Sequence, residues 1–346
     1  MKNKVLHVMI SEKKFALPLV DFILNELKLD NHRFLILNHD YIYQNKNDNV
    51  VLLTSPLRKN LLINLFRFCK EVLKSDKIIA HAAPLSFFFI LLPWKHKSVI
   101  WPIHGGIDIP TSNKSKTFFD FIDKKFKKRI GFHATHIEED SIYTNKVLSS
   151  KAKFVYSPMY LSNIVNVLKN KDAFLFKEGL KNKSVLVGNS TDPSNNHYQA
   201  FKILYESNLN PKSVISILSY GRFLDYKNDV IVSGYDFFGP KFKPVIEFLE
   251  INQYLKLLDE VDYVIFNHER QEAMGVTIQL LSLGKPIFFN EKSPAFKSLK
   301  RRGYHVFSLN EIGDFKNLTN LDLRKNRELL LKEYSIGVLK TFYTQL

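Results

Sequence analysis

Two polar segments of this sequence each follow a short apolar run, and their residue types suit the binding of a phosphorylated ligand. The first follows Val185–Val187 and reads Gly-Asn-Ser-Thr-Asp-Pro-Ser-Asn-Asn-His. A strand that ends in such a loop, followed by a helix capped by Ser194 or Asn195, offers backbone N–H groups to an anion. An ordinary strand–turn–helix junction is the alternative interpretation. The residues expected to contact a phosphorylated ligand here are Gly188, Asn189, Ser190, Ser194 and Asn195.

The second segment, Asn267–Val276, is a highly polar loop between a predicted strand and a helix that opens near Gly275. The loop therefore lies at the carboxyl end of a strand, where open α/β sheets bind ligands. Arg270 has the charge to neutralise a diphosphate. Gln271 or Glu272 is able to hydrogen-bond a sugar. A solvated charged turn is the competing interpretation.

A third candidate segment is His104-Gly105-Gly106-Ile107-Asp108, which also follows a predicted strand. The two glycines permit a tight turn, and His104 and Asp108 are of the residue types that serve as a general base and its orienting partner. Both residues are equally compatible with a structural role in the turn.

Several chemistries are excluded or disfavoured by the pattern. The sequence has no P-loop, no G-x-G-x-x-G fingerprint and no G-x-S-x-G elbow, and its one cysteine, Cys69, excludes a disulfide framework. His133 and His136 lack zinc-site spacing, which favours a solvated helix start. No D-x-D pair stands at a predicted strand end, so a nucleotide sugar would be handled without a metal ion.

The charge indicates an anionic partner. The 346 residues include 50 Lys and Arg against 34 Asp and Glu, a formal charge of +16. Residues 114–129 are dense in lysine and phenylalanine, a pattern typical of a helix lying on anionic lipid; a helix packing its phenylalanines on the core is the alternative. The apolar stretch Ile78–Trp94 is interrupted by proline and is too short to span a bilayer.

Apolar strands alternate with helical segments over most of the chain, which predicts parallel sheets covered by helices. We expect an α/β protein of two doubly wound Rossmann-like domains facing a central cleft. The predicted boundaries are 1–165 for the first domain, 166–322 for the second and 323–346 for a C-terminal helix. Within the second domain Val230–Ser233 is predicted as a strand, and Arg324–Gln345 as one continuous amphipathic helix.

The sequence resembles the TDP-N-acetylfucosamine:lipid II N-acetylfucosaminyltransferases, glycosyltransferase family 56, sometimes labelled 4-alpha-L-fucosyltransferases. Glu272 and Ala273 depart from the glutamine and glycine familiar there, and His104-Gly105 replaces a bulkier pair. The matching residues are His7, Val8, Gly106, Asp108, Arg129, Gly131, Leu186 to Ser190, Asp192, Ser194, Asn195, His197, Arg270, Gln271, Gly275, Gly284, Pro286, Asn290 and Pro294.

The resemblance implies a GT-B fold whose second domain binds a nucleotide-diphosphate sugar, with TDP favoured and no required metal or other cofactor. It implies a polyprenyl-diphosphate-linked acceptor at the inner face of the cytoplasmic membrane, and so a peripheral protein on an anionic surface in bacterial surface polysaccharide synthesis. Asp108, with His104, is then the candidate base if the reaction inverts configuration. If it retains configuration, the loop Glu269–Glu272 matters more, with Glu272 as the third candidate catalytic residue.

Two other functions remain as alternatives. One is a GT-B glycosyltransferase of another family that uses a UDP- or GDP-sugar. The other is a basic nucleic-acid-binding protein, but the sequence has no helix-turn-helix, RRM or zinc-finger signature. We therefore expect no nucleic-acid partner.

Overall fold

The structure is a computed structural model of residues 1–346. It divides into two compact units, one of Met1–Ile164 with Ser335–Leu346 and the other of Val165–Tyr334. The chain therefore leaves the first unit, builds the second and returns to the first. The residues described are 3–11, 15–37, 47–53, 60–81, 86–103, 115, 117–165, 179–221, 223–313, 315 and 319–346.

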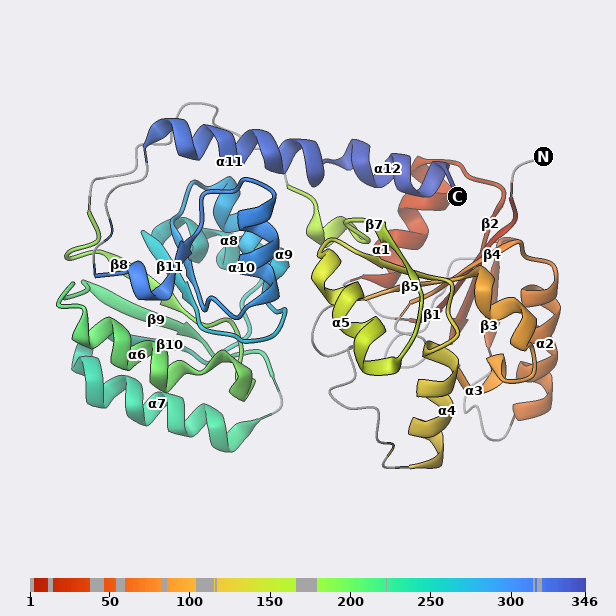
Figure 1. The fold of residues 1–346 in the computed structure, drawn as a ribbon, viewed down its shortest axis with the longest axis horizontal. Helices are drawn as coiled ribbons and strands as arrows, with labels where there is room; N and C mark the ends of the chain where they lie inside the picture. Colours follow the sequence, from red (N-terminus) through yellow and green to blue (C-terminus); the bar gives the residue numbers. More distant parts are fainter. Residues whose placement is uncertain are drawn as a thin grey trace. The chain divides into compact units, whose positions relative to one another are not determined.

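The described residues of the first unit form a parallel sheet of seven strands in the order β3-β2-β1-β4-β5-β6-β7 (Figure 1). The order reverses between β1 and β4, as in a doubly wound sheet. Their bounds are β1 Val5–Ile10, β2 His32–Leu37, β3 Val50–Leu53, β4 Lys77–Ala80, β5 Val99–Pro102, β6 Phe132–Thr135 and β7 Lys153–Tyr156.

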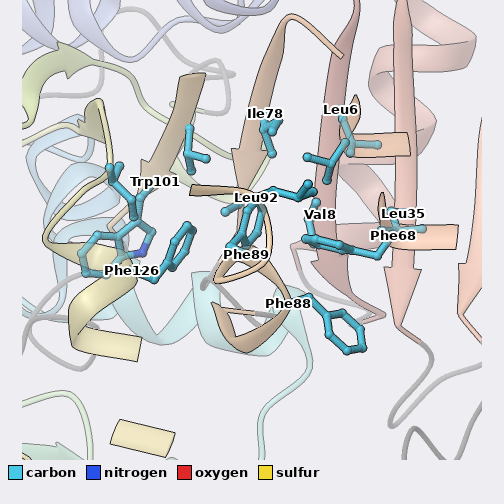
Figure 2. Close-up of a cluster of buried hydrophobic side chains, with 14 of the residues drawn as sticks. Leu6, Val8, Leu35, Phe68, Ile78, Phe88, Phe89, Leu92, Trp101 and Phe126 are labelled. Atoms are coloured by element: carbon cyan, nitrogen blue, oxygen red, sulfur yellow. The ribbon is translucent and has the colours of Figure 1, made fainter. Parts of the chain in front are cut away.

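Helices cover both faces of this sheet, so its central strands are apolar on both sides. In β1, Leu6 and Val8 face one core cluster while Val5 and Met9 face the other. The first cluster is covered by α2 Leu61–Leu73, α3 Ser86–Phe89, α4 Phe118–Lys127 and α5 Glu138–Leu148, with the 3₁₀ turn η2 Pro93–Ser98 following α3 (Figure 2). The second is covered by α1 Ala16–Asp21, the π-helical turn η1 Phe22–Glu26 and α12 Ile336–Thr344; a 3₁₀ turn, η3 Leu161–Asn163, follows β7.

The second unit holds a six-stranded parallel sheet in the order β10-β9-β8-β11-β12-β13. Its strands are β8 Ser184–Val187, β9 Ser213–Ile217, β10 Phe242–Val245, β11 Tyr263–Phe266, β12 Ile287–Phe289 and β13 Phe307–Ser308. Its helices are α6 His197–Glu206, α7 Leu224–Phe238, α8 Ile251–Glu260, α9 Met274–Ser282, α10 Pro294–Arg301 and α11 Asn320–Glu333, with 3₁₀ turns η4 Pro193–Asn195, η5 Gly239–Lys241 and η6 Leu309–Glu311.

Two predicted elements are wrong. Val230–Ser233 lies inside α7, where Gly234 packs against the ring of Phe242, and the strand beyond it is β10. The predicted helix Arg324–Gln345 is two helices, because Ser335 caps a new helix by accepting a hydrogen bond from the Val338 N–H. α11 belongs to the second unit and α12 to the first.

No helix among the described residues is long and apolar enough to cross a membrane. The stretch Ile78–Trp94 begins in β4 and includes α3. Between 117 and 129 the structure has the predicted helix, α4, capped by the Thr117 side chain.

Candidate functional site

The two polar loops predicted to bind a ligand meet in the second unit. They follow β8 and β11, which are hydrogen-bonded neighbours, so both loops leave the same carboxyl edge of the sheet. The Asn196 side chain donates to the Asn267 carbonyl at 3.1 Å, and the Asn267 side chain donates back to the Asn196 carbonyl at 3.3 Å. This reciprocal pair joins the two loops.

Arg270 lies between two carboxylates. Its Nη2 is 2.9 Å from Asp192 Oδ2, and its Nε donates to Glu272. Burial alone would lower the pKa of Arg270, but the hydrogen bonds and charges of Glu272 and Asp192 outweigh it, so the pKa is raised. These three groups carry a formal charge of −1 together, so a diphosphate would compete with two carboxylates for the charge of Arg270.

Glu272 links the loops through a second set of bonds. Besides Arg270 it accepts hydrogen bonds from the Ser194 hydroxyl and, at 3.2 Å, from the Asn195 amide. Asp192 is held similarly: burial would raise its pKa, but bonds from Ser194 and the charge of Arg270 lower it. Glu272, expected as a catalytic residue, is thus also the acceptor that holds these side chains in place.

The backbone around Gly188 is already engaged. The N–H groups of Asn189 and Ser194 donate to the side chains of Asn195 and Asp192, at 2.9 and 3.0 Å. Neither Ser194 nor Asn195 caps α6, contrary to the expectation: both lie in the 3₁₀ turn η4, and the cap position is Asn196 in a left-handed conformation. The Tyr226 hydroxyl instead accepts the first N–H of α6, from His197.

The first turn of α9, unlike the loop around Gly188, has no side-chain cap. Its cap position, Ala273, has a left-handed φ of 58° and makes no side-chain cap, and the first turn contains no acidic residue. The first-turn N–H groups, which include that of Gly275, have no partner within the helix. A helix start of this kind favours an anionic ligand.

Four buried polar atoms in these loops have no hydrogen-bond partner within the described part of the chain. They come from neutral groups that suit a sugar, a base or a phosphate oxygen. Burial lowers the pKa of His197 and of His268 to about 3 each, so both imidazoles are uncharged. The atoms are Asn189 Oδ1, His197 Nε2, His268 Nε2 and Gln271 Oε1.

Two residues that shape this site, His268 and Tyr226, were not predicted from the sequence to bind a ligand. His268 stood inside the second polar segment, but nothing in its spacing distinguished it from a solvated side chain. Tyr226 lies well downstream of the first loop, so only the tertiary fold brings its hydroxyl to His197. His104 and Asp108 lie outside the described residues, and their role stays a prediction. Among the described residues no group of three His, Cys, Asp or Glu side chains is arranged to hold a metal ion.

Comparison with known proteins identifies the family and the fold. The family described as 4-alpha-L-fucosyltransferase, glycosyl transferase group 56, matches residues 5–330. A glycosyltransferase from Rickettsia africae superposes with a TM-score of 0.65 at 12% identity, covering 99% of this chain and 97% of that one. HepE of Anabaena, in complex with UDP and glucose, gives 0.62 at 12% identity with 99% of each chain covered. An alpha,alpha-trehalose-phosphate synthase (UDP-forming) from Burkholderia vietnamiensis gives 0.61 at 10%, with 98% of each covered. The fold is therefore GT-B, as expected.

Proposed function

The chain belongs to the 4-alpha-L-fucosyltransferase family, glycosyl transferase group 56, and is a glycosyltransferase; within that activity we propose that it transfers a deoxyamino or deoxy sugar similar to N-acetylfucosamine. The proposed donor is a nucleotide-diphosphate sugar, with TDP favoured, and the proposed acceptor is a saccharide on polyprenyl diphosphate. The product would serve bacterial surface polysaccharide synthesis at the inner face of the cytoplasmic membrane.

The observation that carries the proposal is the meeting of the β8–α6 and β11–α9 loops. It places an uncapped helix start beside four buried neutral polar atoms. A nucleotide-diphosphate sugar needs this combination, because its diphosphate is anionic while its sugar and base are neutral and rich in hydrogen-bonding groups. The family match supports the same assignment, since it spans both loops.

Under this proposal the site acts on the leaving diphosphate, on which negative charge develops as the sugar–phosphate bond breaks. The α9 start and Arg270 stabilise that charge, and Arg270 does so by exchanging Glu272 or Asp192 for a phosphate oxygen. If configuration inverts, Asp108, with His104, removes the proton of the acceptor hydroxyl. If it is retained, Glu272 and the loop beside it have the larger role.

A panel of nucleotide sugars tests the donor. The preferred nucleotide raises the melting temperature by binding the folded state, so TDP-sugars should give the largest shift at equal concentration. The arrangement resembles that of HepE, whose structure holds UDP and glucose, so UDP-sugars are the second candidate. A larger shift with UDP- or GDP-sugars than with TDP-sugars contradicts the TDP assignment.

Transfer assays test the residues and the metal. Arg270→Ala and Asp108→Asn should each lower transfer in a purified assay, and the site assignment fails if both keep full activity. EDTA should leave transfer unchanged, because under this proposal protein groups alone bind the diphosphate. A loss of activity that Mg²⁺ or Mn²⁺ restores would contradict metal independence.

A further inference from the structure

A cationic groove of about 640 Å³ lies in the first unit, away from the loops described above. Ser115 and Phe121 line it at the start of α4, and Ser149 and Ser150 line it beyond α5. No carboxylate is among its lining residues. Its six basic side chains are Lys97, Lys124, Lys125, Lys128, Arg129 and Lys151.

The charge of the groove is largely uncompensated. Lys124 pairs with Asp120 at 3.0 Å, but the other five basic residues have no carboxylate partner among the residues that the structure describes. Lys125 Nζ lies over the ring of Phe121, 5.7 Å from its centroid. Five cations around one concavity repel one another, and a polyanionic ligand would relieve that repulsion.

The groove lies at the amino edge of the sheet. Lys97 directly precedes β5, Lys128 and Arg129 precede β6, and Lys151 precedes β7, and these three strands are neighbours. Gly131 lets two of these connections approach, because a Cβ there would lie 2.0 Å from the Lys97 carbonyl oxygen.

The helices beside the groove carry apolar side chains on their outer surface. Phe126 of α4 stacks on Phe89 of α3 at 4.5 Å, and Phe89 contacts Phe68 of α2, so these three helices form one layer over the core (Figure 2). The outward side chains are exposed: Leu62 79%, Phe66 70%, Trp94 64%, Phe118 70%, Phe119 66% and Phe121 50%.

The sequence left open whether the phenylalanines of α4 pack on the core or face lipid. The structure divides them: Ile122 and Phe126 are buried, whereas Phe118, Phe119 and Phe121 are exposed. Phe121 also lines the groove, so an exposed aromatic side chain lies beside the basic residues of the groove. Aromatic side chains beside clustered lysines suit the boundary between acyl chains and phosphates.

We propose that this groove is a binding site for the phosphate of a lipid headgroup, reached when the outer surface of α2, α3 and α4 lies on the membrane. The inference rests on the membrane part of the proposed function and adds a defined site to it. The phosphate accepts hydrogen bonds from the groove's lysines and Arg129. Phe118, Phe119 and Phe121 contact the acyl region.

Vesicle flotation of the full chain tests the site, with vesicles of phosphatidylcholine alone or with phosphatidylglycerol added. Wild type should bind the anionic vesicles more tightly. Lys128→Ala with Arg129→Ala should weaken that binding about 25-fold, at about fivefold for each basic residue near an anionic surface. Lys181→Ala with Lys212→Ala is the matched control, because both lysines are exposed in the second unit, outside the groove and the proposed membrane surface, and the charge change is equal. The affinity of this control variant for the anionic vesicles should fall less than fivefold.

Four results would overturn the inference. Equal losses in the two double variants indicate diffuse attraction without a site. A thermal shift with inorganic pyrophosphate that depends on Lys128 and Arg129, without vesicle binding, indicates a soluble ligand. A concentration-dependent dimer abolished by Phe118→Ser with Phe119→Ser makes the apolar surface an interface between copies. Absence of any vesicle binding by wild type, while nucleotide sugars still raise its melting temperature, removes this inference and leaves the donor assignment intact.

Discussion

The Nε2 atom of His197 lies 2.2 Å from the position that a β-carbon would occupy on Gly188. Gly188 also has a φ of +70°, in the left-handed region that side chains disfavour. The glycine that ends β8 is therefore required by an imidazole of its own unit. Its expected role was to let a ligand approach the main chain. The His197 ring occupies this space, and its Nδ1 lies 3.1 Å from the Tyr226 hydroxyl.

Gly188→Ala should destabilise the protein by about 2–4 kcal/mol, because the left-handed backbone and the overpacked His197 ring each contribute. Urea unfolding measures this. Gly337→Ala is the control: Gly337 lies in α12 with only ordinary contact at its Cβ position, so alanine there should be neutral or stabilising. If Gly188→Ala costs no more than the control, the steric explanation is wrong.

Glu272→Gln should separate the structural and catalytic roles of that residue. Glutamine keeps hydrogen-bonding atoms for Ser194 and Asn195 but removes a charge that competes for Arg270. Nucleotide-diphosphate affinity should rise about fivefold, since one unit charge about 4 Å away is worth about 1 kcal/mol in water. Transfer at saturating donor should fall if Glu272 is catalytic. Calorimetry and initial rates measure the two effects, and weaker nucleotide binding would contradict the competition.

Stability should fall as the pH drops below about 6.5. Burial lowers the pKa of His197 and His268 to about 3 and that of His133 to about 4, so the unfolded chain binds more protons than the folded one below the ordinary histidine pKa. Each group then lowers the free energy of unfolding by up to about 1.4 kcal/mol per pH unit, until the pH reaches its pKa in the folded protein. Asp140, whose pKa burial raises, titrates in the opposite sense and offsets part of this.

Urea unfolding at pH 7.5, 6.5, 5.5 and 4.5 measures that slope. His133→Gln removes one of these titrations, to which His7 and His96 also contribute because burial lowers their pKa. The stability of the variant should therefore fall less steeply with acid than that of wild type, by about 1.4 kcal/mol per pH unit. Identical slopes for the two proteins would mean that His133 is not neutralised by burial.

Tyr343→Phe should cost about 1 kcal/mol, because the hydroxyl donates to the Met159 carbonyl at 2.7 Å inside the core. Tyr343→Ala should cost about 3–5 kcal/mol by removing a fully buried ring. Lys340→Ala on the exposed side of α12 is the control and should be near neutral. Thermal unfolding distinguishes the three. Equal melting temperatures for all three variants would show that α12 does not contribute to the core of the first unit.

The parallel sheets were predictable because their strands are apolar on both faces, and the apolar run Val185–Val187 indeed lies in β8. Val230–Ser233 was wrongly predicted as a strand because a short run of β-branched residues is equally compatible with a strand and with one turn of a helix. In α7 this turn buries Val230 and exposes Val232. The break after Tyr334 was missed because the apolar spacing continues across it, while the Ser335 cap is a single polar residue.

The position of each polar loop after a strand was predictable from the sequence, but the adjacency of β8 and β11, which brings the two loops together, comes from the structure. The hydrogen bonds and ion pairs within the two loops were not predictable. Nothing in the spacing of Arg270 and Glu272 indicates that each would bond the other as well as Asp192 or Ser194. The capping expectation for Ser194 failed because Pro193 opens a 3₁₀ turn first, which moves the start of α6 to His197.

The return of the chain into the first unit sets an order of events during synthesis. The second unit, Val165–Tyr334, is continuous, so all of its residues are available once Tyr334 has left the ribosome. The first unit buries Leu339 and Tyr343 beside strands made at the very beginning. Domains usually fold in the order in which they are made. Here the earlier half lacks α12, one of the helices that cover its sheet, until the later half is complete.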